Sequence, residues 1–220
     1  MARPPGCDPG CACRAGNEFG EAEARSALAK YRRSGPPKTT SWLIDGLRDG
    51  GIDGLTVLDI GAGVGAVYQE LLASGASAAT DVEGSPAYLA AAREEAERRG
   101  TTDRIRFVVG DFVLLRSEIE TADLVVLDRV ICCYSDMEAL VRASVTKARH
   151  RYGLVYPRDP WWARRGASIL NGFFRLTRQR VRMYIHPTQA VDAIVRAAGF
   201  RPTLQRTNLF WQVAVYERAA

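Results

Sequence analysis

The stretch VLDIGAGVGAVYQELL, residues 57–72, decides the fold of this chain. It opens with an apolar run typical of a buried parallel strand and closes with apolar residues at helical spacing. Between the two, Gly61, Gly63 and Gly65 permit positive φ angles and expose bare backbone at the positive N-terminus of a helix. The stretch therefore predicts a strand, a glycine turn and a helix. The turn suits an adenosine-containing ligand or, without a ligand, serves only as a tight connection.

Strand and helix patterns alternate along the chain from this stretch onward. Strands are expected at 57–60, 77–82, 105–109, 122–128 and 151–157, and helices at 64–74, 86–99 and 136–149. Strands separated by helices of about 10 to 15 residues imply parallel pairing, with helices covering both faces of the sheet. Such a sheet binds ligands at the carboxyl ends of its strands.

The C-terminal residues break this alternation. QAVDAIVRAAGF, residues 189–200, predicts a helix ended by Gly199, and RPTLQRTNLFWQVAVYER, residues 201–218, predicts two strands. The two strands have too little chain between them for anything but an antiparallel pair. The sequence therefore predicts an α/β, doubly wound, mostly parallel seven-stranded sheet with an antiparallel C-terminal strand, a Rossmann-like fold.

The N-terminal part divides into an arm and a pair of helices. Residues 1–17 form a Cys-, Pro- and Gly-rich arm that we expect to be flexible, and residues 18–220 are expected to form a single domain. Residues 18–50 predict two lid helices separated by a Gly-Pro-Pro break, with Thr39 or Thr40 capping the second helix.

Composition and charge exclude several classes of protein. The chain of 220 residues is 47% hydrophobic and 25% charged, which is ordinary for a soluble globular protein and unlike a fibre or a disordered chain. No apolar run approaches about 18 residues, so we expect a cytoplasmic protein without a membrane span. The net charge of +5 suits an anionic partner but also serves solubility.

The cysteines argue against a disulfide framework, because the chain has five of them. Cys132 and Cys133 are adjacent at the end of a buried pattern, as expected of small apolar side chains. Cys7, Cys11 and Cys13 lie close enough in sequence to share a zinc ion, but no clear fourth ligand accompanies them. We therefore expect free thiols and no metal site.

Acidic residues in or after three of the predicted strands distinguish among adenosine cofactors. Asp59 stands two residues before the first glycine, where it would repel a pyrophosphate but attract a ligand with an ammonium and a sulfonium group. Asp81 and Glu83 lie about twenty residues beyond the turn, where an acid can accept the ribose hydroxyls. Asp111 can accept a hydrogen bond from an adenine amino group, with an apolar neighbour such as Phe112 over the ring. This combination favours a cationic cofactor over a dinucleotide.

Four motifs, VLDIGAGVG, DVEGSPAYLAAAREEAERRG, RFVVGDF and ADLVVLDRV, occur in this order. Together they resemble the successive motifs of class I S-adenosylmethionine-dependent methyltransferases over residues 55–155, and that fold also has an antiparallel tail. The resemblance implies that the glycines approach the methionine part of the cofactor, that Asp59 supports its amino group and that Glu83 binds the ribose. The residues that it assigns to cofactor binding are Asp59, Gly61, Gly63, Gly65, Glu83, Gly110, Asp111, Phe112 and Asp128.

A second resemblance concerns the acceptor side. RVICCYSDMEAL, YPRDPWWARRG and AGFRPTLQRTNLFWQVAVY look like segments of the magnesium-protoporphyrin O-methyltransferase branch. Tyr31 is similar in position to a lid tyrosine of that branch. The class I resemblance implies that Asp128, with Arg129, lies at the end of the fourth strand beside the methyl group. Where the branch has histidine before the tyrosine of the loop after the fourth strand, this chain has Cys133 before Tyr134. Tyr134, Asp128 and Tyr31 are thus candidate catalytic residues, and Cys133 and His186 are further candidate bases.

The insertion at 157–186 is where we expect the acceptor to bind. Apolar residues recur in it at helical spacing, namely Trp162, Ile169, Phe173 and Leu176. Seven arginines within 158–182 surround this stripe, and Asp159 is the only acidic residue there. The pattern suits a hydrophobic, anionic acceptor, peripheral contact with an anionic membrane through 158–182, or a core-packing helix with a solvated basic face. Nucleic acid is not favoured, since no recognised RNA-binding module accompanies the segment.

The sequence therefore predicts an enzyme that transfers a methyl group from S-adenosylmethionine to a small molecule, with oxygen as the expected acceptor atom. One rival is a nucleotide-dependent oxidoreductase, which Asp59 and the antiparallel tail disfavour. Another is a non-catalytic module that binds S-adenosylmethionine or docks to a membrane.

Overall fold

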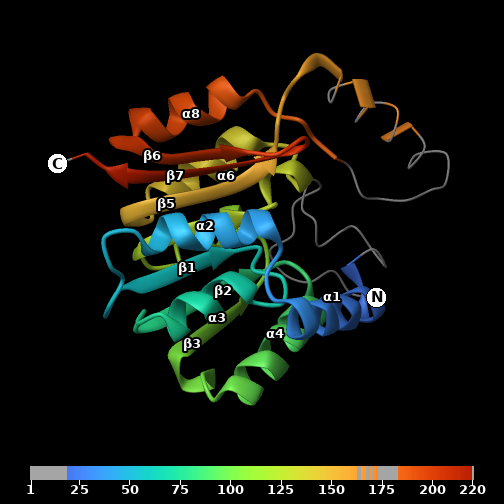
Figure 1. The fold of residues 1–220 in the computed structure, drawn as a ribbon, viewed down its shortest axis with the longest axis vertical. Coiled ribbons are helices and arrows are strands. Elements are labelled where there is room, and N and C mark those ends of the chain that lie inside the picture. The colour runs from blue at the N-terminus through green and yellow to red at the C-terminus, as the bar shows by residue number, and fades with distance from the viewer. Residues whose placement is uncertain (1–18, 163–164, 167–168, 170, 173–182, 220) are drawn as a thin grey trace.

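The computed structural model describes residues 19–162, 165–166, 169, 171–172 and 183–219. One seven-stranded sheet runs through this part of the chain, in the order β3-β2-β1-β4-β5-β7-β6 (Figure 1). The strands are β1 (Thr56–Ile60), β2 (Ala78–Glu83), β3 (Ile105–Val109), β4 (Ala122–Asp128), β5 (Ala148–Pro157), β6 (Phe200–Thr207) and β7 (Trp211–Arg218). The first five run parallel, and β7 lies antiparallel between β5 and β6. This topology confirms the predicted fold.

Helices cover both faces of the sheet (Figure 1). They are α1 (Glu21–Ser34), α2 (Lys38–Arg48), α3 (Ala66–Ala73), α4 (Pro86–Arg99), α5 (Phe112–Leu115), α6 (Met137–Val145) and α8 (Thr188–Ala197), with short 3-10 helices η3 (Thr102–Arg104) and η4 (Ile131–Cys133). One core contains side chains of α6, α8 and the sheet, and the other contains side chains of α2, α3 and the opposite face. The strand order reverses between β1 and β4, so their carboxyl ends flank the point where ligands bind in such sheets.

Two glycines bring α2 unusually close to the sheet. A Cβ atom on Gly153 of β5 would lie 2.6 Å from Leu43 Cδ1, and one on Gly46 of α2 would lie 2.8 Å from Leu204 Cδ2. Leu43 and Leu47 are fully buried at this contact. Burial of each such side chain contributes about 2 kcal/mol to stability, so α2 is held tightly against the sheet. This packing fixes its N-terminal end beside the end of β4.

Two local expectations were wrong. The helix expected at 136–149 ends at Val145, because the chain from Ala148 onward pairs with β4 and extends β5. Neither Thr39 nor Thr40 caps α2, which begins at Lys38 after Pro37; both threonines are buried inside the helix. Pairing of β5 with β4 decided where the helix ends, and the hydrogen bond of Thr40 to the distant Asp128 decided the role of that threonine. The arm at 1–17 lies outside the described residues.

Candidate functional site

The glycine turn has the conformation that its composition predicts. Gly61, Gly63 and Gly65 have φ angles of 67°, 61° and 79°, and Gly65 caps α3 in the left-handed conformation. A Cβ atom on Gly61 would lie 2.6 Å from Cγ2 of Val130. The turn therefore needs glycine both for its backbone angles and for close approach of the chain after β4.

A cavity of about 350 Å³ opens beside this turn at the carboxyl edge of the parallel strands. Many of the residues predicted for cofactor and acceptor line it, namely Asp59, Gly61, Gly63, Glu83, Asp128, Cys133 and Tyr134. Phe19, Ala27, Ser85, Tyr88 and Arg129 also line it. Gly65, Gly110, Asp111 and Phe112 are not among the lining residues. The fold thus gathers side chains from three strand ends and from α1 around one space.

Glu83 is held in place by backbone amides. Its Oε2 accepts a hydrogen bond from Gly63 N–H at 2.9 Å, and its Oε1 accepts one from Ser85 N–H at 2.8 Å. Burial raises the pKa of Glu83, and N–H groups of Ser85, Gly63 and Gly84 oppose that rise. Each oxygen can still accept a second hydrogen bond, so the carboxylate suits a ribose diol.

Asp59 is almost fully buried, and its carboxylate lacks hydrogen-bond partners within the described part of the chain. Neither of its oxygens meets hydrogen-bond geometry with a described residue, although the backbone N–H of Tyr68 faces the carboxylate. Burial raises the pKa of Asp59 well above its usual range, and the charges of Asp128 and Glu83 raise it further. A buried carboxylate without partners that reaches a cavity fits the ammonium group of the predicted cofactor.

Asp81 pairs with Asp59 across β1 and β2 and is fully buried. Burial raises the pKa of Asp81 well above its usual range, with further contributions from Asp59 and Glu83. The phenol of Tyr68 lies over this pair, directly beneath Gly65. Asp81 does not line the cavity, so Glu83 is the better placed of the two acids for the ribose.

The residues predicted for adenine form a closed group. Asp111 caps α5 by accepting a hydrogen bond from Val113 N–H at 2.8 Å. Its oxygens also accept hydrogen bonds from the Tyr134 hydroxyl at 3.1 and 3.2 Å. Gly110 has a φ of 144°, and Phe112 is buried in the core. Tyr134, expected near the acceptor, thus lies between the cavity and Asp111.

Asp128 and Arg129 end β4 beside the cavity and contact α2. The Thr40 hydroxyl donates a hydrogen bond to Asp128 Oδ2 at 2.6 Å and accepts one from Arg129 Nη2 at 2.7 Å. Arg129 Nε lies 3.3 Å from Asp128 Oδ1. Burial raises the pKa of Asp128, while Arg129 and Thr40 lower it. Sequence patterns gave Thr40 the role of a cap; its partner is 88 positions away, so no local signal could identify it.

Of the three predicted catalytic residues, Tyr31 is the one that the structure places away from the cavity. Its hydroxyl donates to Glu70 Oε1 at 2.7 Å and accepts from Arg99 Nη2 at 2.8 Å, and its ring is buried among α1, α3 and α4. Burial, followed by Glu70, raises the pKa of this phenol far above its usual value. Because the side chain does not line the cavity and is a poor base, Tyr31 is not retained as a catalytic candidate.

The other candidate bases hold the loop after β4. His186 Nε2 lies 2.9 Å from the carbonyl oxygen of Ile131 and 3.1 Å from that of Tyr134. Cys132 is buried, and its sulfur lies 3.8 Å from that of Cys133. A hydrogen bond from the Cys132 thiol lowers the pKa of Cys133. His186 therefore anchors the end of the insertion to the loop and does not reach the cavity.

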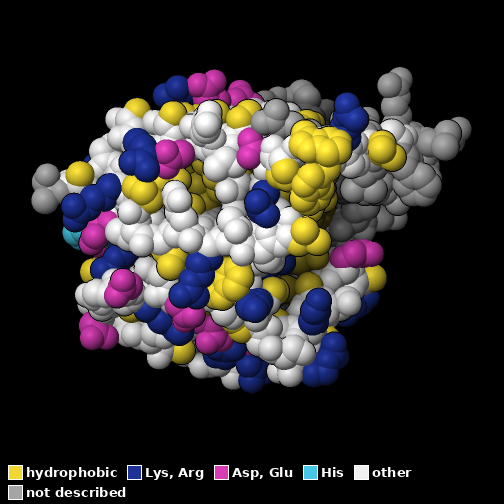
Figure 2. Space-filling model, turned by 45° about the horizontal axis from the view of Figure 1, so that its top comes forward, with side chains coloured by type: hydrophobic (Ala, Val, Ile, Leu, Met, Phe, Trp, Pro, Cys, Tyr) yellow, Lys and Arg dark blue, Asp and Glu magenta, His cyan; other side chains and the backbone are white. Residues whose placement is uncertain are grey.

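Half of the insertion at 157–186 lies outside the described residues, including Phe173, Leu176 and five of its seven arginines. Within the described part, Trp161, Trp162 and Ile169 are 70%, 40% and 75% exposed. The hairpin residue Leu209 is 79% exposed. Figure 2 shows hydrophobic side chains gathered on this face of the molecule next to the undescribed residues. In the described ranges, no cluster of three potential metal ligands occurs, and no helix is long and apolar enough to cross a bilayer.

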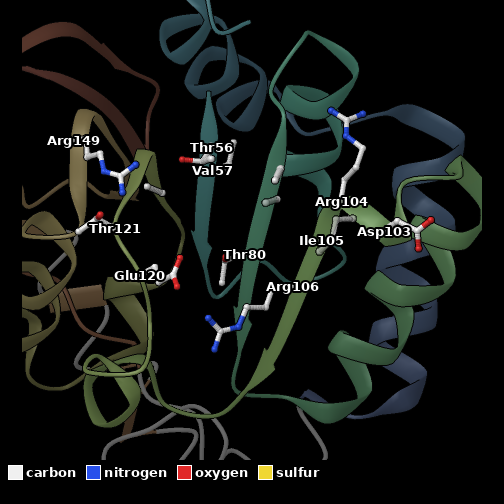
Figure 3. Close-up of a pocket in the computed structure, with 13 residues that line it drawn as sticks. Thr56, Val57, Thr80, Asp103, Arg104, Ile105, Arg106, Glu120, Thr121 and Arg149 are labelled. Carbon is white, nitrogen blue, oxygen red and sulfur yellow. The ribbon is translucent and has the colours of Figure 1, made fainter. Parts of the chain in front are cut away.

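A second hollow, of about 440 Å³, lies at the amino ends of the strands. Figure 3 shows Arg106 and Glu120 approaching it from opposite sides, with Thr80 close to Arg106. None of the predicted site residues lines it. Because ligands of doubly wound sheets bind at the carboxyl edge, the cavity beside the glycine turn is the better candidate site.

Comparisons with known proteins agree with this geometry. Residues 57–149 match a family model described as a methyltransferase domain. The chain is similar in structure to magnesium protoporphyrin IX methyltransferase from Synechocystis PCC 6803 with bound S-adenosylhomocysteine, with 20% identity, a TM-score of 0.64, and coverage of 94% of this chain and 86% of that one. No curated protein sequence matches the chain.

Two further solved structures are similar. One is a methyltransferase in complex with the Trm112 activator from Haloferax volcanii, with 15% identity, a TM-score of 0.68, and coverage of 93% of this chain and 97% of that one. The other is an O-methyltransferase family 2 protein from Planctomyces limnophilus in complex with apigenin, with 18% identity, a TM-score of 0.61, and coverage of 90% and 62%. Residues 57–149 thus match a methyltransferase domain, and the chain shares the fold of these solved methyltransferases.

Proposed function

We propose that the protein transfers the methyl group of S-adenosylmethionine to an oxygen atom of a hydrophobic, anionic small molecule. The observation that supports this proposal is one shared cavity lined by Asp59, Glu83, Asp128 and Tyr134. We assign the first two to the cofactor and the last two to the acceptor. A relative in fold acts on a porphyrin, and another is a complex with apigenin, which supports a small-molecule acceptor.

In this proposal, each predicted cofactor residue has a distinct task. Asp59 attracts the ammonium group, Glu83 accepts the ribose hydroxyls, and the glycine turn admits the methionine part close to the backbone. Asp111 accepts a hydrogen bond from the adenine amino group. Its oxygens already accept hydrogen bonds from the Tyr134 hydroxyl, so cofactor binding either adds to these bonds or replaces them. S-adenosylmethionine supplies an electrophilic methyl group on a positively charged sulfur.

The chain's own contribution to the reaction is largely positioning. Methyl transfer needs the acceptor oxygen in line with the methyl carbon and the sulfur, and holding that geometry supplies most of the rate enhancement. A carboxylate or phenolate acceptor needs no base, whereas a hydroxyl acceptor needs one nearby. Asp128 is the best placed base, because it lines the cavity and burial raises its pKa.

Calorimetry of the purified protein tests the cofactor part of this proposal. We expect micromolar binding of S-adenosylmethionine and S-adenosylhomocysteine and no binding of NADH. Asp59→Asn should bind both sulfur compounds more weakly, which links the binding to this cavity. Binding of NADH alone would favour an oxidoreductase. Binding of S-adenosylmethionine without turnover when cell extracts supply acceptors would favour a non-catalytic module.

We also propose peripheral contact of the exposed aromatic face with an anionic membrane, because Trp161, Ile169 and Leu209 are exposed beside Arg158 and Arg165. Large exposed apolar side chains rimmed by cations suit a lipid surface. In a sedimentation assay with phosphatidylglycerol vesicles, the unchanged protein should appear in the pellet with the vesicles. The double variant Trp161→Ser with Leu209→Ser should stay in the supernatant. Equal binding of the double variant and the unchanged protein would contradict this contact.

A further inference from the structure

Arg129 has an unusual backbone conformation at the acceptor end of the cavity. Its φ angle is 61°, and it is the only non-glycine residue with a positive φ in the part of the chain that the structure describes. Its N–H donates to the Val155 carbonyl at 2.8 Å, so the bend is fixed between β4 and β5. A left-handed conformation is unfavourable for an arginine and persists where the surroundings enforce it, often at functional sites.

The bend places the guanidinium group in a defined frame. Nη2 donates to Thr40 Oγ1 at 2.7 Å and lies 3.5 Å from Thr39 Oγ1, while Nε faces Asp128 Oδ1 at 3.3 Å. The guanidinium carbon lies 5.6 Å from the centre of the Trp211 ring. Four elements, α2, β4, β5 and β7, therefore hold one positive charge at the rim of the cavity.

These contacts involve Nη2 and Nε of Arg129 and leave Nη1 able to donate hydrogen bonds to a ligand. No residue of the described ranges accepts a hydrogen bond from Nη1, and the side chain is 34% exposed. Among the described residues, Asp128 is the one carboxylate paired with Arg129, and it also accepts a hydrogen bond from the Thr40 hydroxyl. Arginine binds anionic oxygens through paired N–H groups, and such charge-assisted bonds are stronger in a partly desolvated site than in water.

We propose that Arg129 binds an anionic oxygen of the acceptor and that Thr40 positions it for this task. This inference rests on the proposed methyl transfer and names the residue that makes the site select for negative charge. Arg129 lines the same cavity as Asp128 and Tyr134, so an anion held by its free edge would lie close to the methyl group of the cofactor. In this proposal, Arg129 contributes more to binding the acceptor's negative charge than the arginines of the insertion do.

The test uses the full-length protein saturated with S-adenosylhomocysteine and two probes of the same shape, 2-naphthoate and 2-naphthamide. The first carries a carboxylate and the second is neutral, so their affinities differ by the contribution of the negative charge. Calorimetry should show naphthoate binding to the unchanged protein about tenfold more tightly than naphthamide, the lower end of what a charged hydrogen bond contributes. Arg129→Gln should abolish that preference, and Arg129→Lys should retain part of it.

Variants at Thr40 separate positioning from general packing. Thr40→Val removes the hydroxyl and should reduce the preference for naphthoate severalfold, while Thr40→Ser keeps the hydroxyl and should restore it. Arg165→Gln is the matched control, because Arg165 is also an arginine stacked on a tryptophan, at 5.4 Å from the Trp161 ring. It should leave the preference unchanged.

Each alternative outcome overturns the inference. Equal binding of the two probes, or no binding of naphthoate, would mean that the unchanged protein has no anion site here. A preference that survives Arg129→Gln but is lost in Arg165→Gln would move the anion to the insertion. The titration with S-adenosylhomocysteine is done first: failure at that step contradicts the proposed function, whereas failure only with naphthoate contradicts the role of Arg129.

Discussion

The backbone N–H of Gly63 donates a hydrogen bond to Oε2 of Glu83 at 2.9 Å, joining the glycine turn to the end of the neighbouring strand. The two residues are 20 positions apart in the chain and meet because β1 and β2 are parallel neighbours whose carboxyl ends lie at one edge. Glu83 thus fixes the turn through one lone pair of its carboxylate and retains others that can accept hydrogen bonds from a ligand.

Replacement of Glu83 should weaken cofactor binding. Glu83→Ala is expected to reduce the affinity for S-adenosylhomocysteine by about 1–3 kcal/mol, because the ribose hydroxyls would lose buried acceptors. Glu83→Gln should lose less, since its amide oxygen still accepts from Gly63. Calorimetry measures both. Unchanged affinity in a folded Glu83→Ala protein would transfer the ribose to another acid.

Replacement of Asp59 should have opposite effects on stability and binding. The folded-state pKa of Asp59 lies above its unfolded value, so the folded protein holds this proton more tightly and stability falls as the pH rises through the folded pKa. Above that pH, Asp59→Asn should stabilise the cofactor-free protein by about 1–3 kcal/mol, because it removes an unsatisfied buried charge. It should also weaken S-adenosylmethionine binding. Urea denaturation and calorimetry provide the two values, and a destabilised variant would show that Asp59 has a structural partner.

Tyr134 and the adenine ring are expected to compete for Asp111. Tyr134→Phe removes the hydrogen bonds at 3.1 and 3.2 Å that would have to be shared or broken on binding. The affinity for S-adenosylhomocysteine should therefore rise by up to about 1 kcal/mol, the net contribution of a neutral hydrogen bond. Asp111→Asn is the control and should weaken binding. Weaker binding by Tyr134→Phe would mean that the hydroxyl contacts the cofactor itself.

Glu95 should make the protein sensitive to acid. Its side chain is fully buried and accepts hydrogen bonds from Arg32 at 2.8 Å, Arg98 at 2.6 Å and Arg99 at 2.8 Å. Burial acts to raise its pKa, but the three arginines outweigh that effect and lower the pKa to about 2. A lowered folded-state pKa gives stability that is present above the unfolded value of about 4.3 and is lost as the pH falls toward 2.

The corresponding variant tests this dependence. Glu95→Gln should destabilise the protein by about 3 kcal/mol at neutral pH, because it leaves arginines beside α1 and α4 without their buried partner. Its stability should change less between pH 4.5 and pH 2 than that of the unchanged protein, about the window set by the two pKa values. Glu94→Gln is the matched control: Glu94 is 59% exposed and pairs with Arg32 at 2.9 Å, so a change below about 1 kcal/mol is expected. Equal losses in both variants would contradict burial as the cause.

Short-range patterns in the sequence predicted most of the sheet. β3, β4 and α4 have the bounds that alternation and apolar periodicity predict, 105–109, 122–128 and 86–99. These features depend on backbone angles and on periodicities within a few residues. The glycine turn and Glu83 belong to the same class, because parallel strands bring their carboxyl ends to one edge.

The sequence alone therefore determined the order of strands and helices, the turn and the acids at the strand ends, since backbone stereochemistry and hydrophobic periodicity act locally. Only the tertiary structure decided which side chains meet beside the end of β4. It placed Tyr31 on Glu70 and Arg99, away from the cavity, and Thr40 between Asp128 and Arg129. These contacts depend on how closely α1 and α2 pack against distant strands and helices. No pattern within a short stretch of chain carries that information.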